Sequence, residues 1–179
     1  MLALQHCLLE TAIGTFAVGW SAAGIGRVAL PGRAPHDAAS RAADWGRTPG
    51  VPTGAAAVLA ERISAYADGR PERFDDLPLD LTGVPDFHRR CYAVIGRLGW
   101  GETTTYGAIA RELGDVGLSR AVGAAMGANP IPLVIPCHRV LGANGKPGGF
   151  SAPGGVGSKL EMLRLERAAT PEGQLSLGL

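Results

Sequence analysis

The chain has 179 residues, of which 46% are apolar, so it can bury a real core in one domain or two small ones, and disorder throughout is not expected. Its net charge of +1 points to no particular partner, and no apolar run reaches the length that spans a bilayer. Three widely spaced cysteines make no disulfide framework, and residues 1–14 lack the features of a signal peptide, so we expect a cytoplasmic protein without a membrane partner.

Charge is unevenly distributed along the chain. Residues 1–83 carry seven Lys or Arg against nine Asp or Glu, whereas residues 84–168 carry ten against six. The net charges of these parts are −2 and +4, and residues 169–179 add −1. A basic second part favours a polyanionic partner there, although ordinary variation of surface charge gives the same pattern.

The first part of the chain has the pattern of a small α/β unit that ends near Gly83. Alternating apolar residues indicate strands, and apolar residues at helical spacing before Gly69 indicate one clear helix. The expected elements are strands at 2–10 and 15–30 with a turn at 21–26, a loop or weak helix at 31–53, a helix at 55–67 and a short strand at 77–81.

The second part is expected to be mainly helical. The predicted elements are a helix from Asp86 to Leu98 capped by Asp86, a helix from Tyr106 to Leu113 capped by Thr104 or Thr105, a turn at 114–118 and a helix from Arg120 to Gly127 capped by Ser119. Two short helices joined by a glycine-containing turn are typical of a helix-turn-helix, although a generic helical hairpin has the same pattern.

The helix at 120–127 has an unusual composition. After Arg120 it carries alanine or glycine at almost every position, and each glycine weakens a helix by ~1 kcal/mol relative to alanine. A helix that reads the major groove needs long polar side chains for base edges. Small side chains instead suit close approach to a minor groove or to another helix.

A cysteine and a histidine lie next to each other after an apolar run. We expect Leu133–Ile135 to be a buried strand, with Cys137 and His138 at its end. A thiol is a poor nucleophile until it ionises, and an imidazole can take its proton directly or through water. Neighbours in an extended chain point apart, so this contact requires a sharp turn or a bridging water. Structural burial and a partial metal site are the alternatives for the pair alone.

The residues around this pair resemble the O6-alkylguanine-DNA alkyltransferase family. The matching segments are GETTTYGAIA at 101–110, SRAVGAAMGANP at 119–130, NPIPLVIPCHRV at 129–140, GGFS at 148–151 and KLEMLRLE at 159–166. They occur in the family's order and cover nearly all of residues 84–168. ETAIGTFAVGW and GIGRVALPG resemble the family's weakly constrained first domain.

The resemblance implies a role for five residues in the chemistry. Cys137 would accept the alkyl group, and His138 would take its proton through a water while Glu166 holds His138. Asn129 would stabilise the turn that bears the cysteine, and Tyr106 would lie over the base and assist the leaving guanine. The transfer would be irreversible and limited to one alkyl group per chain, without a cofactor. O6-methylguanine would be the chief lesion, and O4-alkylthymine is left open.

The resemblance also implies a fold and a way of binding double-stranded DNA. Residues 1–83 would form an α/β domain similar to ribonuclease H, residues 84–168 a mainly α domain with a winged-helix-like helix-turn-helix, and residues 169–179 a flexible tail. The protein would act as a monomer on the minor groove, through Arg120, Ala121, Gly123 and Tyr106. Arg120 would fill the gap left by the flipped base. The substrate pocket would be lined by Met126, Val140, Phe150 and Ser151, with the Val140 carbonyl on the guanine amine and the Ser151 amide near O6.

Two features depart from the family pattern. Phe150 stands where most members have tyrosine, and the segment from Ser151 to Lys159 is two residues longer than usual. The width of the pocket, and so the range of alkyl groups, is therefore open. Zinc ligands of some members are not evident, and His6, Cys7 and His88 are interpreted as packing or surface residues, so no metal is expected.

Three rival functions remain to be weighed. A non-catalytic, lesion-binding relative of the family carries tryptophan where this chain has Cys137. A cysteine hydrolase needs an oxyanion hole and turnover. A helix-turn-helix transcription factor needs base-reading side chains, which the helix at 120–127 lacks. Alkyl transfer to Cys137 is the favoured hypothesis, with a non-catalytic regulatory DNA-binding protein as the alternative.

The segment QLSLGL at 174–179 resembles the motif by which bacterial repair proteins bind the replication sliding clamp. In that motif the glutamine occupies a polar subsite, and later apolar residues occupy an apolar pocket. The corresponding residues here are Gln174, Leu175, Leu177 and Leu179. Packing of the leucines on the protein's own surface is the alternative.

Overall fold

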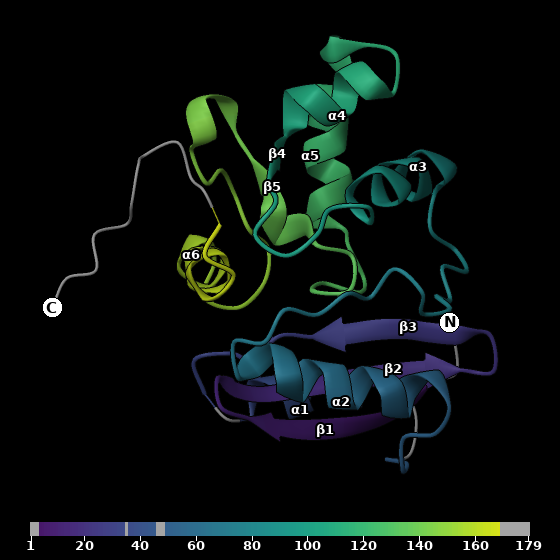
Figure 1. The fold of residues 1–179 in the computed structure, drawn as a ribbon. Coiled ribbons are helices and arrows are strands. Elements are labelled where there is room, and N and C mark those ends of the chain that lie inside the picture. The colour runs from purple at the N-terminus through teal and green to yellow at the C-terminus, as the bar shows by residue number, and fades with distance from the viewer. Residues whose placement is uncertain (1–3, 35, 46–48, 169–179) are drawn as a thin grey trace, which may run out of the picture. The chain divides into compact units, whose positions relative to one another are not determined.

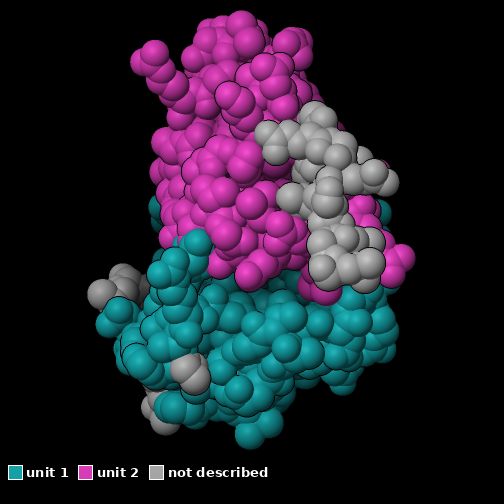
Figure 2. Space-filling model, turned by 90° about the vertical axis from the view of Figure 1, so that its left-hand side faces the viewer, with its two compact units in different colours: residues 1–84, 130–134, 152–154 teal, residues 85–129, 135–151, 155–179 magenta. Residues whose placement is uncertain are grey.

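The computed structural model describes residues 4–34, 36–45 and 49–168, which form a mixed α/β fold as expected (Figure 1). The chain divides into two compact units, coloured separately in Figure 2. Unit 1 comprises residues 1–84, 130–134 and 152–154, and unit 2 comprises the remainder. Within the described residues, no helix is both long and apolar enough to cross a membrane.

Unit 1 is built on a three-stranded antiparallel sheet in the order β1-β2-β3. The strands are β1 (Gln5–Thr11), β2 (Gly14–Ser21) and β3 (Gly24–Ala29). Residues 15–20 of β2 are all buried, although their side chains alternate between the two faces. Both faces of the central strand are therefore covered by other parts of the unit.

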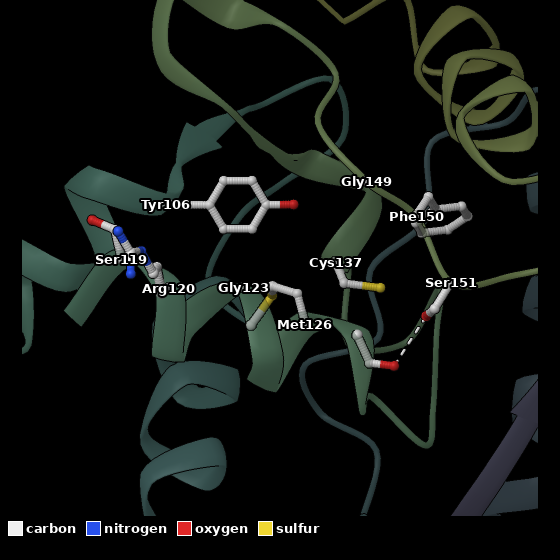
Figure 3. Close-up of a pocket in the computed structure, with 10 residues that line it drawn as sticks. Tyr106, Ser119, Arg120, Gly123, Met126, Cys137, Gly149, Phe150 and Ser151 are labelled. Carbon is white, nitrogen blue, oxygen red and sulfur yellow. Dashed lines mark hydrogen bonds between the residues drawn. The ribbon is translucent and has the colours of Figure 1, made fainter.

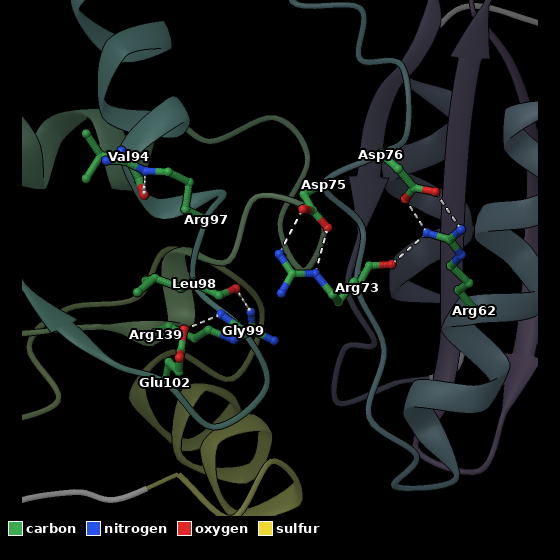
Figure 4. Close-up of polar contacts among 10 residues, drawn as sticks. All are labelled: Arg62, Arg73, Asp75, Asp76, Val94, Arg97, Leu98, Gly99, Glu102 and Arg139. Carbon is green, nitrogen blue, oxygen red and sulfur yellow. Dashed lines mark hydrogen bonds and ion pairs between the residues drawn. The ribbon is translucent and has the colours of Figure 1, made fainter.

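Two helices pack on this sheet, α1 (Asp37–Ala43) and α2 (Ala55–Ala67). On α1, Ala38 and Ala42 pack with Ala17 and Ala29 of the sheet in one small apolar cluster. The predicted helix at 55–67 is confirmed with the same bounds, and α1 lies within the segment expected to be a loop or weak helix. Arg62 of α2 forms an ion pair with Asp76, which lies beyond the end of the helix (Figure 4).

The short strand predicted at 77–81 is wrong. That segment makes a single parallel bridge between Leu79 and Ile25, with backbone hydrogen bonds to Ile25 on both sides. Pro78 has no N–H to donate, so a continuous ladder is not available to this segment.

Unit 2 contains α3 (Asp86–Ile95), α4 (Tyr106–Glu112) and α5 (Ser119–Gly127), with a short 3-10 turn, η1 (Val116–Leu118), between α4 and α5. The two short helices and their connecting turn are confirmed. A buried hydrogen bond of 2.8 Å from the Tyr92 hydroxyl to the Ala125 carbonyl joins α3 to α5.

The predicted helix caps are confirmed in one case and wrong in two. The Thr105 hydroxyl accepts a hydrogen bond from Ala108 N and caps α4 as expected. Asp86 and Ser119 do not cap, because each already lies inside its helix, and the Ser119 hydroxyl donates to the Val116 carbonyl instead. The helix predicted from Asp86 to Leu98, α3, ends at Ile95.

The predicted strand at Leu133–Ile135 is also wrong. These residues form a turn with isolated bridges at its sides, and Leu133 has a φ of 76°, in the left-handed region. Prolines at 130, 132 and 136 remove backbone donors on either side, so a ladder cannot form there. The turn leads directly into a 3-10 helix, η2 (Cys137–Arg139).

Two short strands, a 3-10 turn and a last helix complete unit 2. A two-residue strand, β4 (Thr104–Thr105), pairs in parallel with β5 (Val140–Leu141). After another short 3-10 turn, η3 (Ala143–Gly145), the chain reaches α6 (Val156–Leu165), which buries Lys159, Met162 and Leu163. The pairing of β4 with β5 places the beginning of α4 beside the residues that follow Cys137.

Candidate functional site

A cavity of about 630 Å³ opens in unit 2, within the size range of small-molecule sites (Figure 3). The Cys137 side chain lies on its wall and is 5% exposed. Residues from α4, α5, η2 and the segment before α6 contribute to the lining: Tyr106, Ser119, Arg120, Gly123, Met126, Gly127, Cys137, Gly149, Phe150 and Ser151.

The position of Cys137 results from a sharp turn, which is one of the two alternatives that the sequence left open. The 3-10 helix η2 begins at Cys137, so the side chains of Cys137 and His138 do not point to opposite sides as in a strand. Asn129 holds this turn, because its Nδ2 donates a 2.8 Å hydrogen bond to the carbonyl of Ile135. Leu133, with its left-handed backbone, reverses the chain just before the turn.

The Cys137 thiol is surrounded by groups that act on its ionisation in opposite directions. Burial raises the pKa of the thiol. A hydrogen bond from the Asn129 side chain, the charge of Lys159 and the backbone amides of Cys137 and His138 favour the thiolate and lower it, but less strongly. The resting cysteine is therefore a thiol, in surroundings that already contain donors for the thiolate.

His138 and Glu166 form a buried pair next to the cysteine. His138 Nε2 lies 2.6 Å from Glu166 Oε1, and both side chains are fully buried. Among the described residues, His138 Nδ1 has no hydrogen-bond partner. In the tautomer in which Nε2 carries the hydrogen and donates a hydrogen bond to the carboxylate, Nδ1 has a lone pair that can accept a proton.

Arg139 shares the same carboxylate. Its Nε lies 2.8 Å from Glu166 Oε2, and its Nη2 lies 3.1 Å from Oε1. Its Nη1 also donates a 2.6 Å hydrogen bond to the carbonyl of Leu98 (Figure 4). Gly101 N donates to Oε2 at 3.3 Å, and a Cβ at Gly101, where φ is 74°, would lie 2.9 Å from the Glu166 carbonyl. Glycine at 101 therefore allows this close approach.

These contacts determine the charge states in the cluster. Burial alone would raise the pKa of Glu166, but the hydrogen bonds from His138 and Arg139 and the charge of Arg139 outweigh it and lower the pKa to about 2. Burial lowers the pKa of His138 more than Glu166 raises it, and the Arg139 charge lowers it further. At neutral pH, the cluster therefore holds a carboxylate, a guanidinium and a neutral imidazole that can act as a base.

Tyr106 stands at the first position of α4, directly after β4. Because β4 pairs with β5, this places the ring on the wall of the cavity that holds Cys137 (Figure 3). Gly148 lies close to the ring: a Cβ there, where φ is 65°, would be 3.3 Å from a ring carbon. Burial raises the pKa of the Tyr106 hydroxyl, and the charge of a Cys137 thiolate raises it further, so it remains a proton donor.

The helix α5 forms another side of the cavity. Arg120, at its second residue, is exposed and lines the cavity together with Gly123 and Met126. A Cβ at Gly123 or Gly127 would meet nothing within 4 Å, so these glycines face open space rather than neighbouring protein. The small residues of α5 therefore leave its backbone accessible to another molecule.

Some of the predicted site residues lie apart from the cavity lining. Val140 is fully buried, and its carbonyl accepts a 2.5 Å hydrogen bond from Lys159 Nζ. Ala121 lies on α5 without lining the cavity. Phe150 and Ser151 line it as expected, and the Ser151 hydroxyl donates to the Gly127 carbonyl at 3.0 Å. Residues 174–179 lie outside the described residues.

Three residues at or near this site were not predicted from the sequence. Arg139 pairs with Glu166, the buried Lys159 has its Nζ 5.9 Å from the centre of the Tyr106 ring, and the Tyr92 hydroxyl has a pKa raised to about 12 by burial and by the charges of Cys137 and Cys91. For Lys159 a signal existed, because Met162 and Leu163 follow at three- and four-residue spacing on the same helical face.

Among the described residues, no group of three or more His, Cys, Asp or Glu side chains is arranged to hold a metal ion. The residues His6 and Cys7 are buried in unit 1, and His88 lies on α3 of unit 2.

Comparison with known proteins shows what the chain is similar to. Residues 86–168 match the model of the 6-O-methylguanine DNA methyltransferase DNA-binding domain. A methylated-DNA–protein-cysteine methyltransferase of Mycobacterium bovis is 41% identical over 127 residues, which cover 71% of this chain and 72% of that relative. A DNA base-flipping protein of Thermus thermophilus is 46% identical over 111 residues, covering 62% of this chain and 72% of the relative.

The same relationship extends to solved structures. The crystal structure of Mycobacterium tuberculosis OGT in complex with DNA is 31% identical in sequence, with a TM-score of 0.73. The match covers 94% of this chain and 97% of that chain, so it includes most of both units.

Proposed function

The chain belongs to the methylated-DNA–protein-cysteine methyltransferase family, and we propose that it repairs O6-alkylguanine in DNA by transferring the alkyl group to its own Cys137. Family membership makes it an enzyme of DNA repair by alkyl transfer. The observation that carries the choice of acceptor is the Cys137 thiol on the wall of the cavity, with His138 and Glu166 behind it.

Proton removal from Cys137 starts from the neutral imidazole. His138 Nε2 donates to Glu166, and Nδ1 accepts the thiol proton through a bridging water. The carboxylate then stabilises the imidazolium, which follows the logic of a nucleophile–histidine–acid triad with a solvent relay. Asn129 and the nearby backbone amides stabilise the thiolate as it forms.

The transfer is a displacement at the alkyl carbon. The Cys137 sulfur forms a bond to that carbon, the bond from the carbon to guanine O6 breaks, and its electron pair stays on the guanine. The purine then gains a proton, for which Tyr106 is the donor on the cavity wall. The product is a thioether, which water does not cleave, so each molecule acts once.

Access to O6 requires that the nucleotide leave the stack. Flipping costs a few kcal/mol, which a side chain that fills the gap partly offsets. Arg120 is suited to this role, because it is exposed at the beginning of α5 and borders the cavity. Small residues along α5, including Ala121 and Gly123, permit close approach to the minor groove, with α4 and α5 acting as a helix-turn-helix of winged-helix type.

The remaining residues of the predicted substrate pocket would hold the base. Met126 and Phe150 supply apolar contacts, and the Ser151 backbone amide serves as donor to O6. The Val140 carbonyl is proposed to accept from the guanine amine on its second lone pair, because Lys159 already donates to this oxygen. Residues 1–83 would serve as a ribonuclease H-like first domain, and residues 84–168 as the part that binds DNA and transfers the alkyl group.

We also propose that residues 174–179 bind the replication sliding clamp. Gln174 would act as the polar anchor, with Leu175, Leu177 and Leu179 as the apolar residues that follow it. Binding of this kind would bring a monomer to the site of replication, where unrepaired O6-alkylguanine is copied. A short peptide with few anchors loses entropy on ordering, so a dissociation constant of ~1 μM is expected.

Substitution of the acceptor tests the proposed function. The Cys137→Ser variant should bind DNA and transfer no alkyl group, since a hydroxyl is far less acidic than a thiol. Cys7→Ser and Cys91→Ser are the matched controls and should keep full transfer from an O6-methylguanine duplex. Transfer that survives in Cys137→Ser and is lost in one of the controls would assign the acceptor role elsewhere.

A further inference from the structure

The carbonyl of Ala125, near the end of α5, accepts a hydrogen bond from another helix. In an uninterrupted α-helix its donor would be the backbone amide four positions later, that of Asn129. The Asn129 amide instead donates to the Met126 carbonyl at 3.3 Å, so the helical ladder breaks at this residue. The Tyr92 hydroxyl of α3 takes its place and donates to the Ala125 carbonyl at 2.8 Å. A side chain of α3 therefore supplies the hydrogen bond that the ladder of α5 does not.

The hydrogen bond between Tyr92 and Ala125 is buried. Tyr92 is 3% exposed and Ala125 is 0% exposed. A buried carbonyl that loses its donor carries the full cost of its desolvation. Burial and the charges of Cys137 and Cys91 raise the pKa of Tyr92 to about 12, so the hydroxyl keeps the proton that it donates. The contact is therefore present throughout the range of pH in which Cys137 ionises.

The neighbouring carbonyls at the end of α5 are satisfied in other ways. Ala124 keeps its helical partner, the Ala128 amide at 3.0 Å, and Gly127 accepts from the exposed Ser151 hydroxyl at 3.0 Å. Water can replace a donor at the surface, but it does not replace one at a buried carbonyl so readily. Tyr92 is therefore the donor on which the end of α5 depends most.

The break in the ladder leaves Asn129 in position for its contacts with the reactive turn. Its Nδ2 donates a 2.8 Å hydrogen bond to the Ile135 carbonyl, two residues before Cys137. A hydrogen bond from the Asn129 side chain also favours the Cys137 thiolate and lowers the pKa of the thiol. If the Asn129 amide donated to the Ala125 carbonyl, α5 would continue through Asn129 and carry its side chain to a different place. The donor at Ala125 therefore decides where Asn129 lies.

We propose that Tyr92 is a positioning residue of the alkyl-transfer site, whose hydroxyl ends the α5 ladder at Ala125 and so places Asn129 against the turn that bears Cys137. This inference rests on the proposed function of Cys137. It gives α3 a part in the reactivity of the cysteine, although Tyr92 is not one of the residues that line the cavity.

The ionisation of Cys137 gives the proposal a measurable signature. The titratable groups around the thiol are Tyr92 on α3, Tyr106 on α4, His138 on η2 and Lys159 on α6. Replacing the Tyr92 hydroxyl leaves the other three in the chain, and the hydroxyl itself carries no charge below about pH 12. A shift in the ionisation of Cys137 in such a variant therefore reports the loss of the hydrogen bond from Asn129.

The test uses Tyr92→Phe, which removes the hydroxyl and keeps the ring. Tyr66→Phe is the matched control, because it removes a hydroxyl from a fully buried tyrosine of unit 1. The readouts are the pH dependence of the rate at which iodoacetamide labels Cys137, located by peptide mass, and the rate of transfer from free O6-benzylguanine. Iodoacetamide reports the thiolate even if alkyl transfer were absent, so failure of this proposal and failure of the proposed function give different results.

Tyr92→Phe should move the midpoint of Cys137 labelling to higher pH by about one unit, which is a tenfold loss of thiolate at a given pH, and should slow transfer by a similar factor. Tyr66→Phe should keep the midpoint and the transfer rate of the parent, even where its melting temperature falls. A lower melting temperature of Tyr92→Phe with an unmoved midpoint would show that its hydroxyl only supports the fold, and would overturn the proposal.

A double variant shows whether Tyr92 acts through Asn129. Asn129→Ala should itself raise the midpoint, and adding Tyr92→Phe should raise it no further, because the side chain that Tyr92 positions is then absent. Shifts that add in the double variant would overturn the proposal. If Asn129→Ala does not fold by circular dichroism, Tyr92→Phe alone decides, and a labelling profile that superimposes on the parent's would overturn the proposal equally.

Discussion

Glu166 Oε1 lies 2.6 Å from His138 Nε2, and both side chains are completely buried although 28 positions separate them in the chain. The same carboxylate is held on its other side by Arg139, at 2.8 and 3.1 Å. It is therefore fixed in position and ionised, and it fixes the imidazole with its Nδ1 available as a base. We therefore expect this pair to determine the rate of alkyl transfer.

Glu166→Gln should slow alkyl transfer by ~100-fold or more, the usual scale of an acid–base contribution. The amide keeps the shape of the side chain but cannot stabilise the imidazolium that forms with the thiolate. Single-turnover rates with an O6-methylguanine duplex measure this effect. Glu161→Gln, on the exposed side of α6, is the control and should leave the rate unchanged. A Glu166→Gln rate within twofold of the parent would remove this residue from the mechanism.

Arg139→Met should move the acid limb of the pH–rate profile to higher pH. The charge of Arg139 lowers the pKa of His138, so its removal lets the imidazole bind a proton at a higher pH and lose its function as a base. Transfer from free O6-benzylguanine between pH 5 and pH 8 measures the shift. Arg111→Met removes an exposed cation from α4 and should leave the limb in place. A limb that moves to lower pH in Arg139→Met contradicts the charge assignment in this cluster.

Arg120→Ala should slow repair in duplex DNA while leaving the reaction with free O6-benzylguanine nearly unchanged. Only the duplex reaction needs a side chain to occupy the place of the flipped base, and each 1.36 kcal/mol lost from the transition state is about tenfold in rate. The comparison uses both substrates under the same single-turnover conditions. An equal loss on both would show that Arg120 supports the structure of the cavity instead.

Removal of the last six residues should abolish clamp binding without affecting alkyl transfer. A form that ends at Gly173, and the full chain with Gln174→Ala and Leu177→Ala, should both lose the sliding clamp in a titration by calorimetry. The intact chain should bind at ~1 μM. Absence of binding by the intact chain at ~100 μM clamp would reject the docking motif. A loss of thermal stability on truncation would assign the leucines to the fold.

Local patterns predicted most of the elements that carry the site. The helix at 55–67, the two helices around the turn at 114–118 and the cap at Thr105 follow from spacing and capping chemistry. A sharp turn at Cys137 and His138, one of the two predicted alternatives, is present as a 3-10 helix. Such features depend on residues within a few positions of one another, which a sequence displays directly.

The predictions that were wrong concern competition between local signals. The apolar run at Leu133–Ile135 resembles a buried strand, but prolines on both sides remove donors and the backbone of Leu133 turns into the left-handed region. Ser119 has the chemistry of a cap, yet its hydroxyl donates to the Val116 carbonyl from inside the helix. In each case the side-chain pattern is consistent with two backbone conformations. The neighbouring residues favour the conformation that was not predicted.

The charges of the site could not be predicted from spacing. Arg139 is 27 positions from Glu166, and Lys159 is 19 positions from Val140, so only the folded chain brings these groups together. Burial of Lys159 follows from the apolar face of α6, but the direction of its ammonium towards the rings of Tyr106 and Phe150 does not.

Intact-mass measurement of the protein after incubation with a duplex containing O6-methylguanine tests the central claim most directly. Transfer to Cys137 predicts that the chain gains the mass of one methyl group in place of a hydrogen, that the gain saturates at one per chain, and that peptide mapping locates it on Cys137. Lesion loss that exceeds one per chain, lesion loss without a gain in protein mass, or a methyl group found on Cys7 or Cys91 would contradict the account.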